Sequence, residues 1–157
     1  MIQKDYIMRM IEQVTRLIAK ALQRKSDDEY EEALSIIESA SGSILGIDYT
    51  LFDALSSADC ANLLGITKDP STASIKCLIG ARLLKTRADV LIEISNDSAS
   101  GRAYYQKAID LYRIGFAAIG YNELDLTGFY RDITEIANRF PDMLPKETMT
   151  NIKIKNI

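Results

Sequence analysis

The chain has 157 residues, of which 47% are apolar and 26% are charged, and its formal net charge is −3. This length is typical of one domain, and this composition is typical of a soluble globular protein and excludes wholesale disorder. Histidine and tryptophan are absent, which excludes catalysis by imidazole and every metal site that needs a histidine ligand.

Apolar residues recur every three or four positions in the first segment, over 7–22, which predicts an amphipathic helix. Ser26 and Glu29 are predicted to form a capping box at the start of a second helix, over about 30–45. Gly46 follows that helix at the position where a glycine commonly ends one.

Residues 48–65 are predicted to form two short helices, the second of which Ser56 caps. Asp69 and Pro70 are predicted to begin a long helix that runs to about Ser95. The apolar residues of this long helix fall on two stripes. A helix that is apolar on two sides has neighbours on two sides, so we expect it in the middle of the fold.

Two further helices are predicted, one that ends near Ile119 and one that Asp125 caps and Pro141 stops. No segment alternates as a strand for long. The sequence therefore predicts an all-α fold of about seven helices in stacked antiparallel pairs. We expect one helical domain over 1–150 and a loosely held C-terminal tail over 151–157.

Small residues occur at matching positions of two predicted helical hairpins. Ala21 and Ala33 each lie six residues from the turn near Asp27, and Gly80 and Gly115 lie seventeen and eighteen residues from the turn near residue 97. Small side chains at one level of two helices allow the backbones to approach closely. We therefore predict that each pair meets across its hairpin.

These hairpins resemble tetratricopeptide-type helical repeats. The resemblance covers 2–45 and 71–119, and it is carried by Leu17, Ala21, Ala33, Ile37 and Ala40 in the first hairpin and by Leu84, Ala88, Gly101, Tyr105 and Ala108 in the second. It implies a right-handed superhelix or bundle in which the inner helix of each pair lines a groove that often holds a peptide. The opening residues 1–13 also resemble a family of uncharacterised bacterial proteins, a domain of unknown function with tetratricopeptide-like helices.

Charge is distributed unevenly along the chain. Residues 26–67 contain nine acidic residues and no Lys or Arg. Such a segment would repel a phosphate backbone, so we predict no nucleic-acid partner. It forms either a solvated acidic face or a surface that docks on the basic first helix or on a basic partner.

The compartment is predicted from the two cysteines and from hydropathy. Cys60 and Cys77 are too far apart for a CxxC motif, and two buried free thiols are typical of a reducing compartment. Charged residues interrupt the first twelve positions, unlike a signal peptide. The apolar stretch 114–121 is far too short to span a membrane. We predict a cytoplasmic protein without membrane contact.

Arg82, Lys85, Thr86 and Asp89 share one face of the long helix by helical spacing alone. The tetratricopeptide resemblance implies that this face lines the groove, where Arg82 and Lys85 would clamp a carboxylate of a peptide. The alternative, which we favour, is a solvated or internally paired face, for example against the acidic segment 48–59. In the first hairpin the equivalent Ile18 and Leu22 indicate core or an apolar groove.

Other motifs that carry chemistry are missing from the sequence. It contains no glycine-rich phosphate loop, no GxSxG motif and no ExxH pair. The acids over 27–32 lack the spacing of a calcium loop, and the aromatic residues over 104–130 are expected in the core. We therefore predict no catalytic residue, no metal site and no cofactor.

The sequence favours a non-enzymatic module that binds a protein or peptide along a helical surface. One alternative is a small ligand sensor or an enzyme with an unrecognised pocket between helices. Another is a structural homodimer that uses the first helix as a seam, through Ile7, Ile11, Val14, Ile18 and Ala21. Reversing the charges of Arg82 and Lys85 is predicted to abolish capture of a partner without unfolding the protein.

Overall fold

The computed structural model describes residues 2–95, 98–119 and 125–143. Within these ranges the chain forms seven α-helices, one short 3-10 helix and no strand, so the predicted all-α class is confirmed. The elements are α1 (Ile2–Ser26), α2 (Tyr30–Leu45), α3 (Tyr49–Ala54), α4 (Ser57–Leu63), α5 (Pro70–Ser95), α6 (Ser98–Ala117), α7 (Thr127–Arg139) and the 3-10 helix η1 (Pro141–Met143). The tail predicted over 151–157 lies outside the described residues.

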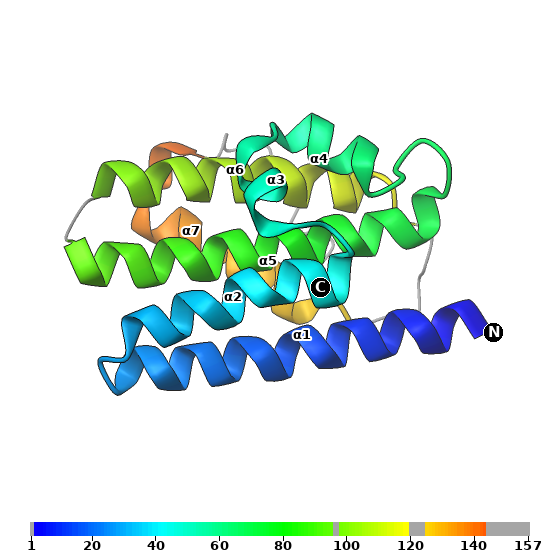
Figure 1. Ribbon diagram of the computed structural model, residues 1–157. Helices are drawn as coiled ribbons and strands as arrows, with labels where there is room; N and C mark the ends of the chain where they lie inside the picture. The colour runs from blue at the N-terminus through cyan, green and yellow to red at the C-terminus, as the bar shows by residue number, and fades with distance from the viewer. Residues whose placement is uncertain (1, 96–97, 120–124, 144–157) are drawn as a thin grey trace.

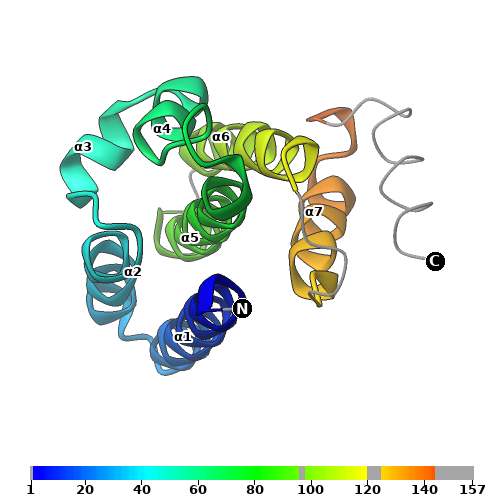
Figure 2. The same cartoon turned by 90° about the vertical axis from the view of Figure 1, so that its right-hand side faces the viewer.

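Helix α5 lies at the centre of the molecule. It contacts α1, α2, α4, α6 and α7, which confirms the position predicted from its two apolar stripes. Helices α1 and α2 form one antiparallel hairpin, and α5 and α6 form another beside it (Figure 1). Viewed along the helices, α3 and α4 curve around one side of α5, and α7 lies on the opposite side (Figure 2).

Most helix ends follow the predicted capping residues. Gly46 ends α2 with φ of +72°, a left-handed conformation that glycine adopts without strain. At the start of α4, the hydroxyl of Ser56 accepts a hydrogen bond of 3.1 Å from the backbone N–H of Asp59. Where α5 begins, the Asp69 carboxylate accepts a hydrogen bond of 3.5 Å from the backbone N–H of Thr72. The sequence signals for these three ends are therefore confirmed.

The predicted capping box between Ser26 and Glu29 is wrong. Helix α1 runs on through Ser26, and no side chain caps the start of α2 at Glu29. The Glu29 carboxylate instead accepts a hydrogen bond of 2.7 Å from the Arg24 guanidinium. Asp28 makes the sharp turn with φ of +60°, a conformation that aspartate tolerates better than most residues. An ion pair and a strained turn residue therefore replace the expected cap.

The two glycines of the second hairpin do not face each other. A Cβ atom on Gly80 would lie 3.2 Å from the ring of Phe52 in α3, whereas one on Gly115 would lie 2.8 Å from the backbone oxygen of Ser74 and 2.7 Å from Leu78. Gly115 thus lets α6 approach α5, and Gly80 makes room for α3 on another side. The predicted pairing of Gly80 with Gly115 is therefore wrong.

The aromatic residues belong mainly to the core, as predicted. Tyr105, Tyr112 and Phe129 are almost completely buried. The ring of Phe116 in α6 stacks on that of Tyr130 in α7, with 4.5 Å between their centroids. None of the helices in the described part of the chain is both long and apolar enough to cross a membrane.

Candidate functional site

The four predicted site residues line the bottom of a cavity of about 580 Å³ between α1 and α7. We call this cavity the α1–α7 groove, and we call Arg82, Lys85, Thr86 and Asp89 the α5 row. Helices α1 and α7 lie on the two sides of the groove, and α5 lies between them at its bottom (Figure 2). The groove is lined by Ile11, Glu12, Thr15, Ile18 and Leu22 of α1, by the α5 row, by Asp125, and by Gly128, Phe129, Arg131, Asp132 and Glu135 of α7.

Arg82 is buried against α7 and is only 9% exposed. Its Nε donates a hydrogen bond of 2.8 Å to Oδ2 of Asp132, and its guanidinium carbon lies 4.3 Å from the centroid of the Phe129 ring. A Cβ atom on Gly128 would collide with the guanidinium nitrogen Nη2 of Arg82. Helix α7 therefore holds the Arg82 cation in place through the Asp132 carboxylate and the face of the Phe129 ring, and Gly128 leaves room for it.

Asp132 also joins α6 to this contact. The hydroxyl of Tyr112, a fully buried residue of α6, donates a hydrogen bond of 2.8 Å to Oδ2 of Asp132. Burial and the nearby Asp132 carboxylate raise the pKa of Tyr112 well above its ordinary value. One carboxylate oxygen of α7 thus accepts hydrogen bonds from both α5 and α6.

Lys85 lies between two carboxylates. Its ammonium nitrogen is 3.1 Å from Oδ2 of Asp89, one turn along α5, and it also pairs with Glu135 of α7. Burial alone would lower the pKa of Lys85, but Asp89 and Glu135 outweigh burial, and the pKa lies above its ordinary value. Lys85 is therefore a fully protonated cation at neutral pH.

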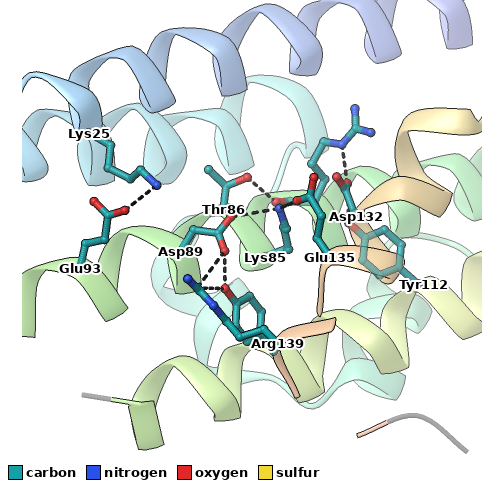
Figure 3. Close-up of polar contacts among 11 residues, drawn as sticks. Lys25, Lys85, Thr86, Asp89, Glu93, Tyr112, Asp132, Glu135 and Arg139 are labelled. Atoms are coloured by element: carbon teal, nitrogen blue, oxygen red, sulfur yellow. Dashed lines mark hydrogen bonds and ion pairs between the residues drawn. The ribbon is translucent and has the colours of Figure 1, made fainter. Parts of the chain in front are cut away.

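Asp89 is the far end of the α5 row, and α6 and α7 both engage it. Tyr105 of α6 donates a hydrogen bond to the Asp89 carboxylate, and Arg139 of α7 lies 3.8 Å from the same carboxylate. Arg139 also donates to the Tyr105 hydroxyl at 2.8 Å. Figure 3 shows Lys85 between Asp89 and Glu135, and Arg139 directed toward Asp89. The α5 row is thus one polar network with α7.

Thr86 completes the row without offering a free donor. Its hydroxyl donates a hydrogen bond of 2.8 Å to the backbone oxygen of Arg82, and the residue is 2% exposed. The hydroxyl proton is used inside helix α5, which is a common arrangement for threonine in a helix. Thr86 therefore contributes its shape, rather than a donor, to the bottom of the groove.

A second cavity, of about 480 Å³, adjoins the groove and shares Lys85, Asp89 and Glu135 with it. It adds Arg139 and also Lys25, whose ammonium nitrogen is 3.0 Å from the Glu93 carboxylate (Figure 3). The groove therefore continues toward the C-terminal ends of α1 and α7.

The wall that α1 gives the groove is mainly apolar, with Glu12 and Thr15 as its polar members. Ile11 and Ile18 are partly buried and Leu22 is 37% exposed, which agrees with the apolar groove surface predicted for Ile18 and Leu22. Other members of the predicted dimer seam, namely Ile7, Val14 and Ala21, are 0% exposed in the chain's own core. The predicted five-residue seam therefore cannot pair with a second copy, because the chain itself covers three of its five residues.

The sequence identified the α5 row but not its partners. Arg82 and Lys85 pair with α7, and the acidic segment 48–59 suggested as a partner lies elsewhere. There Asp53 instead accepts a hydrogen bond of 2.8 Å from Tyr104, and Asp48 caps α3. One signal was present in the sequence: Asp132, Glu135 and Arg139 share one face of α7 by their spacing. No sequence rule states that this face meets α5.

The cysteines offer no nucleophile to the groove. Cys60 and Cys77 are free and buried, as predicted. Burial, reinforced by neighbouring Cys60, raises the pKa of the Cys77 thiol to about 12, and burial likewise raises the pKa of Cys60. Both thiols are therefore protonated at neutral pH. No group of three Cys, Asp or Glu side chains suited to a metal ion occurs among the residues with described positions.

A model of a family of unknown function, DUF6483, matches residues 1–132. The match includes α1, the whole α5 row and Asp132, and it ends inside α7. No curated protein and no solved structure matches the chain.

Proposed function

The chain belongs to the DUF6483 family, whose function is unknown, and on that premise we propose that it is a non-enzymatic module that binds a peptide or protein segment in the α1–α7 groove. The proposal includes a tetratricopeptide-like relation between the pairs α1–α2 and α5–α6, with α5 as the inner helix of its pair. A bacterial origin and a cytoplasmic location remain predictions.

The form of the groove is the observation that carries this proposal. One wall is an apolar stripe of α1 that the chain leaves partly uncovered, and the bottom is a row of polar groups held in place by α6 and α7. Partly exposed apolar side chains beside ordered polar groups are typical of a surface that receives another chain. The polar groups are already ordered, so binding would cost little side-chain entropy.

The engaged state of the α5 row supports binding rather than catalysis. A general acid or base needs a titratable group near the operating pH and within reach of substrate. Lys85 is held protonated by two carboxylates, and the Asp89 carboxylate accepts a hydrogen bond from Tyr105. Lys85 and Asp89 therefore suit a fixed part of a binding surface better than a pair that transfers a proton.

A small-ligand sensor is the second candidate, and the size of the groove favours it. Its volume of about 580 Å³ falls in the range of roughly 300–1,000 Å³ that small-molecule sites occupy. The two candidates differ in what must contact α1, because a peptide would extend along the stripe whereas a small molecule would fill only part of it.

The test is affinity capture from the native host with two matched variants of α1. Ile18→Asp places a charge on the groove wall, and Ala19→Asp places the same charge on the neighbouring exposed position outside the groove. We expect Ile18→Asp to lose the captured partner and Ala19→Asp to retain it, with both variants folded by circular dichroism. Equal capture by the two variants would contradict the groove as the binding site.

The double charge reversal of Arg82 and Lys85 is not a suitable test. Arg82 is buried and Lys85 is half-buried against carboxylates of α7, so two glutamates there would meet Asp132 and Glu135 as like charges. The double reversal is therefore expected to unfold the protein, in contrast to the prediction from the sequence. Substitutions on the α1 wall probe the groove without breaking the network below it.

A further inference from the structure

Acidic residues outnumber basic residues in the lining of the α1–α7 groove. The carboxylates are Glu12, Asp89, Asp125, Asp132 and Glu135, and the cations are Arg82, Lys85 and Arg131. The groove is thus an acidic concave surface, although the chain as a whole carries only a small net charge. A concave surface of one sign concentrates ligands of the opposite sign.

The cations at the bottom of the groove are already neutralised. Asp132 engages Arg82, while Asp89 and Glu135 engage Lys85. An incoming carboxylate would have to displace the half-buried Asp89 or Asp132 or the exposed Glu135, which would leave a carboxylate of the chain without its cation. The groove therefore does not favour the acidic peptide that the sequence suggested for Arg82 and Lys85.

The exposed charge lies on the two rims. Glu12 on α1 and Asp125 before α7 are both exposed, and neither forms an ion pair with another residue of the described part of the chain. Arg131 of α7 is also exposed in the lining, on the same side as Asp125. The Thr127 side chain, the Thr127 backbone N–H, which donates to Asp125 at 3.1 Å, and the nearby Arg131 cation lower the pKa of the Asp125 carboxyl. Asp125 is therefore ionised at neutral pH, and the rims present two exposed carboxylates, Glu12 and Asp125, against the exposed cation Arg131.

The wall between these rims is an apolar stripe with helical spacing. Ile11, Ile18 and Leu22 follow one another along one face of α1 over about three turns. A helix that lies beside such a stripe contacts it through apolar residues spaced three and four apart. Its flanking side chains then reach the rims.

The adjoining cavity adds no site for an anion. Lys25 is paired with Glu93 at 3.0 Å, and Arg139 is engaged by Tyr105 and Asp89. These cations are neutralised in the same way as those of the α5 row. The rim carboxylates Glu12 and Asp125, which outnumber the exposed Arg131, therefore remain the charge that selects an occupant.

We infer that the α1–α7 groove takes a cationic amphipathic helix of a partner protein. Its apolar face lies on Ile11, Ile18 and Leu22, and its Lys or Arg side chains pair with Glu12 and Asp125. This inference rests on the proposed function and names the class of segment that the groove binds.

The test measures the binding of two fluorescent peptides to the full chain by anisotropy. Both are amphipathic helices of about 18 residues, or five turns, with leucines spaced three and four apart. The first has lysine at all other positions and the second has glutamate. We expect the lysine peptide to bind at least about tenfold more tightly than the glutamate peptide, and we expect added salt to weaken its binding.

Matched variants locate the bound peptide. Glu12→Lys is expected to weaken the lysine peptide about tenfold, and Asp125→Asn is expected to act in the same direction. Ile18→Asp is expected to remove binding because it places a charge on the apolar wall. The control is Glu31→Lys, which makes the same charge change at an exposed position of α2 outside the groove. It is expected to leave the affinity almost unchanged.

The outcomes separate this inference from the proposed function. Tighter binding of the glutamate peptide, lost in Ile18→Asp, would overturn the cationic class and keep the groove as a peptide site. Equal weakening by Glu12→Lys and Glu31→Lys would indicate attraction to net charge alone and would overturn the inference. If neither peptide binds, the inference fails. The proposed function fails with it only when Ile18→Asp also leaves partner capture unchanged.

Discussion

Helix α5 contacts α6 and α7 in different ways. Its interface with α6 is mainly a close apolar contact, in which Gly115 admits Leu78 and the backbone at Ser74, and the hydrogen bond from Tyr105 to Asp89 is added at one end. Its interface with α7 combines buried apolar residues with the pairs Arg82–Asp132 and Lys85–Glu135. The position of α6 therefore depends mainly on filling volume, and the position of α7 depends in addition on keeping opposite charges together. The two interfaces should fail under different perturbations.

The largest effect is expected from removing the carboxylate of Asp132. Asp132→Ala would leave Arg82 and Tyr112 without their acceptor in a buried site. Breaking a buried pair from one side costs about 3–5 kcal/mol. Urea denaturation would measure this loss of unfolding free energy. The control Asp132→Asn retains an acceptor and should lose less, and equal losses would contradict a role for the carboxylate charge.

Truncation in the α5–α6 interface is expected to cost somewhat less and to respond differently to salt. Leu78→Ala removes a fully buried side chain against α6 and should cost about 2–5 kcal/mol of unfolding free energy. Because no charge is involved, the loss should be the same at low and high ionic strength. A loss that changes strongly with salt would show that the two interfaces do not differ as described.

Alanine substitution at two glycines is expected to change the free energy of unfolding by a smaller amount, and in opposite directions. Gly115→Ala would place a Cβ atom 2.8 Å from the Ser74 backbone oxygen and should destabilise by about 1–3 kcal/mol. Gly42→Ala in α2 meets nothing within 4 Å and should stabilise by about 0.4–1 kcal/mol. Thermal unfolding of both variants tests this. A gain in Gly115→Ala would refute the close contact.

Two tyrosines and one lysine beside α7 are expected to make the free energy of unfolding depend on pH. The effect is the smallest of the four near neutral pH, and it grows at alkaline pH. Tyr112, Tyr105 and Lys85 all have a pKa above the ordinary value in the folded chain. The unfolded chain therefore releases these protons first as pH rises. Their contribution to stability is complete below about pH 10, the ordinary tyrosine value, and is lost above it.

Tyr112→Phe tests this alkaline effect. The variant should lose less unfolding free energy than the wild type between about pH 9 and pH 11, which brackets the ordinary tyrosine pKa. Urea denaturation at the two pH values gives this difference, and any constant loss from the missing hydrogen bond to Asp132 cancels from it. Parallel losses in the two proteins would contradict a raised pKa of Tyr112.

The sequence predicts the local features of this fold well. Gly46, Ser56 and Pro70 act within a few residues of themselves, and the ends they predict are the ends observed. The common face of the α5 row follows equally from helical spacing. Ser26 and Asp125 are exceptions. Arg24 takes the Glu29 carboxylate that the Ser26 capping box would have used, and Leu126, not Asp125, is the N-cap residue of α7.

The partners of the α5 row could not be predicted, because they depend on where α7 lies. Asp132 is fifty residues beyond Arg82, and the intervening helix α6 decides which face of α5 it reaches. The pairing of Gly80 with Gly115 failed for a related reason. Counting residues from a turn gives the level of a residue along a hairpin, but it does not give the direction of its Cβ.

The contact of Arg82 with Gly128 has an evolutionary consequence. Gly128 and Asp132 lie one helical turn apart, one leaving room for the guanidinium and the other binding it. Related chains should therefore change these three positions together. A homologue with leucine or methionine at position 82 would no longer need a glycine at 128 or an acid at 132, whereas one that retains the arginine should retain both.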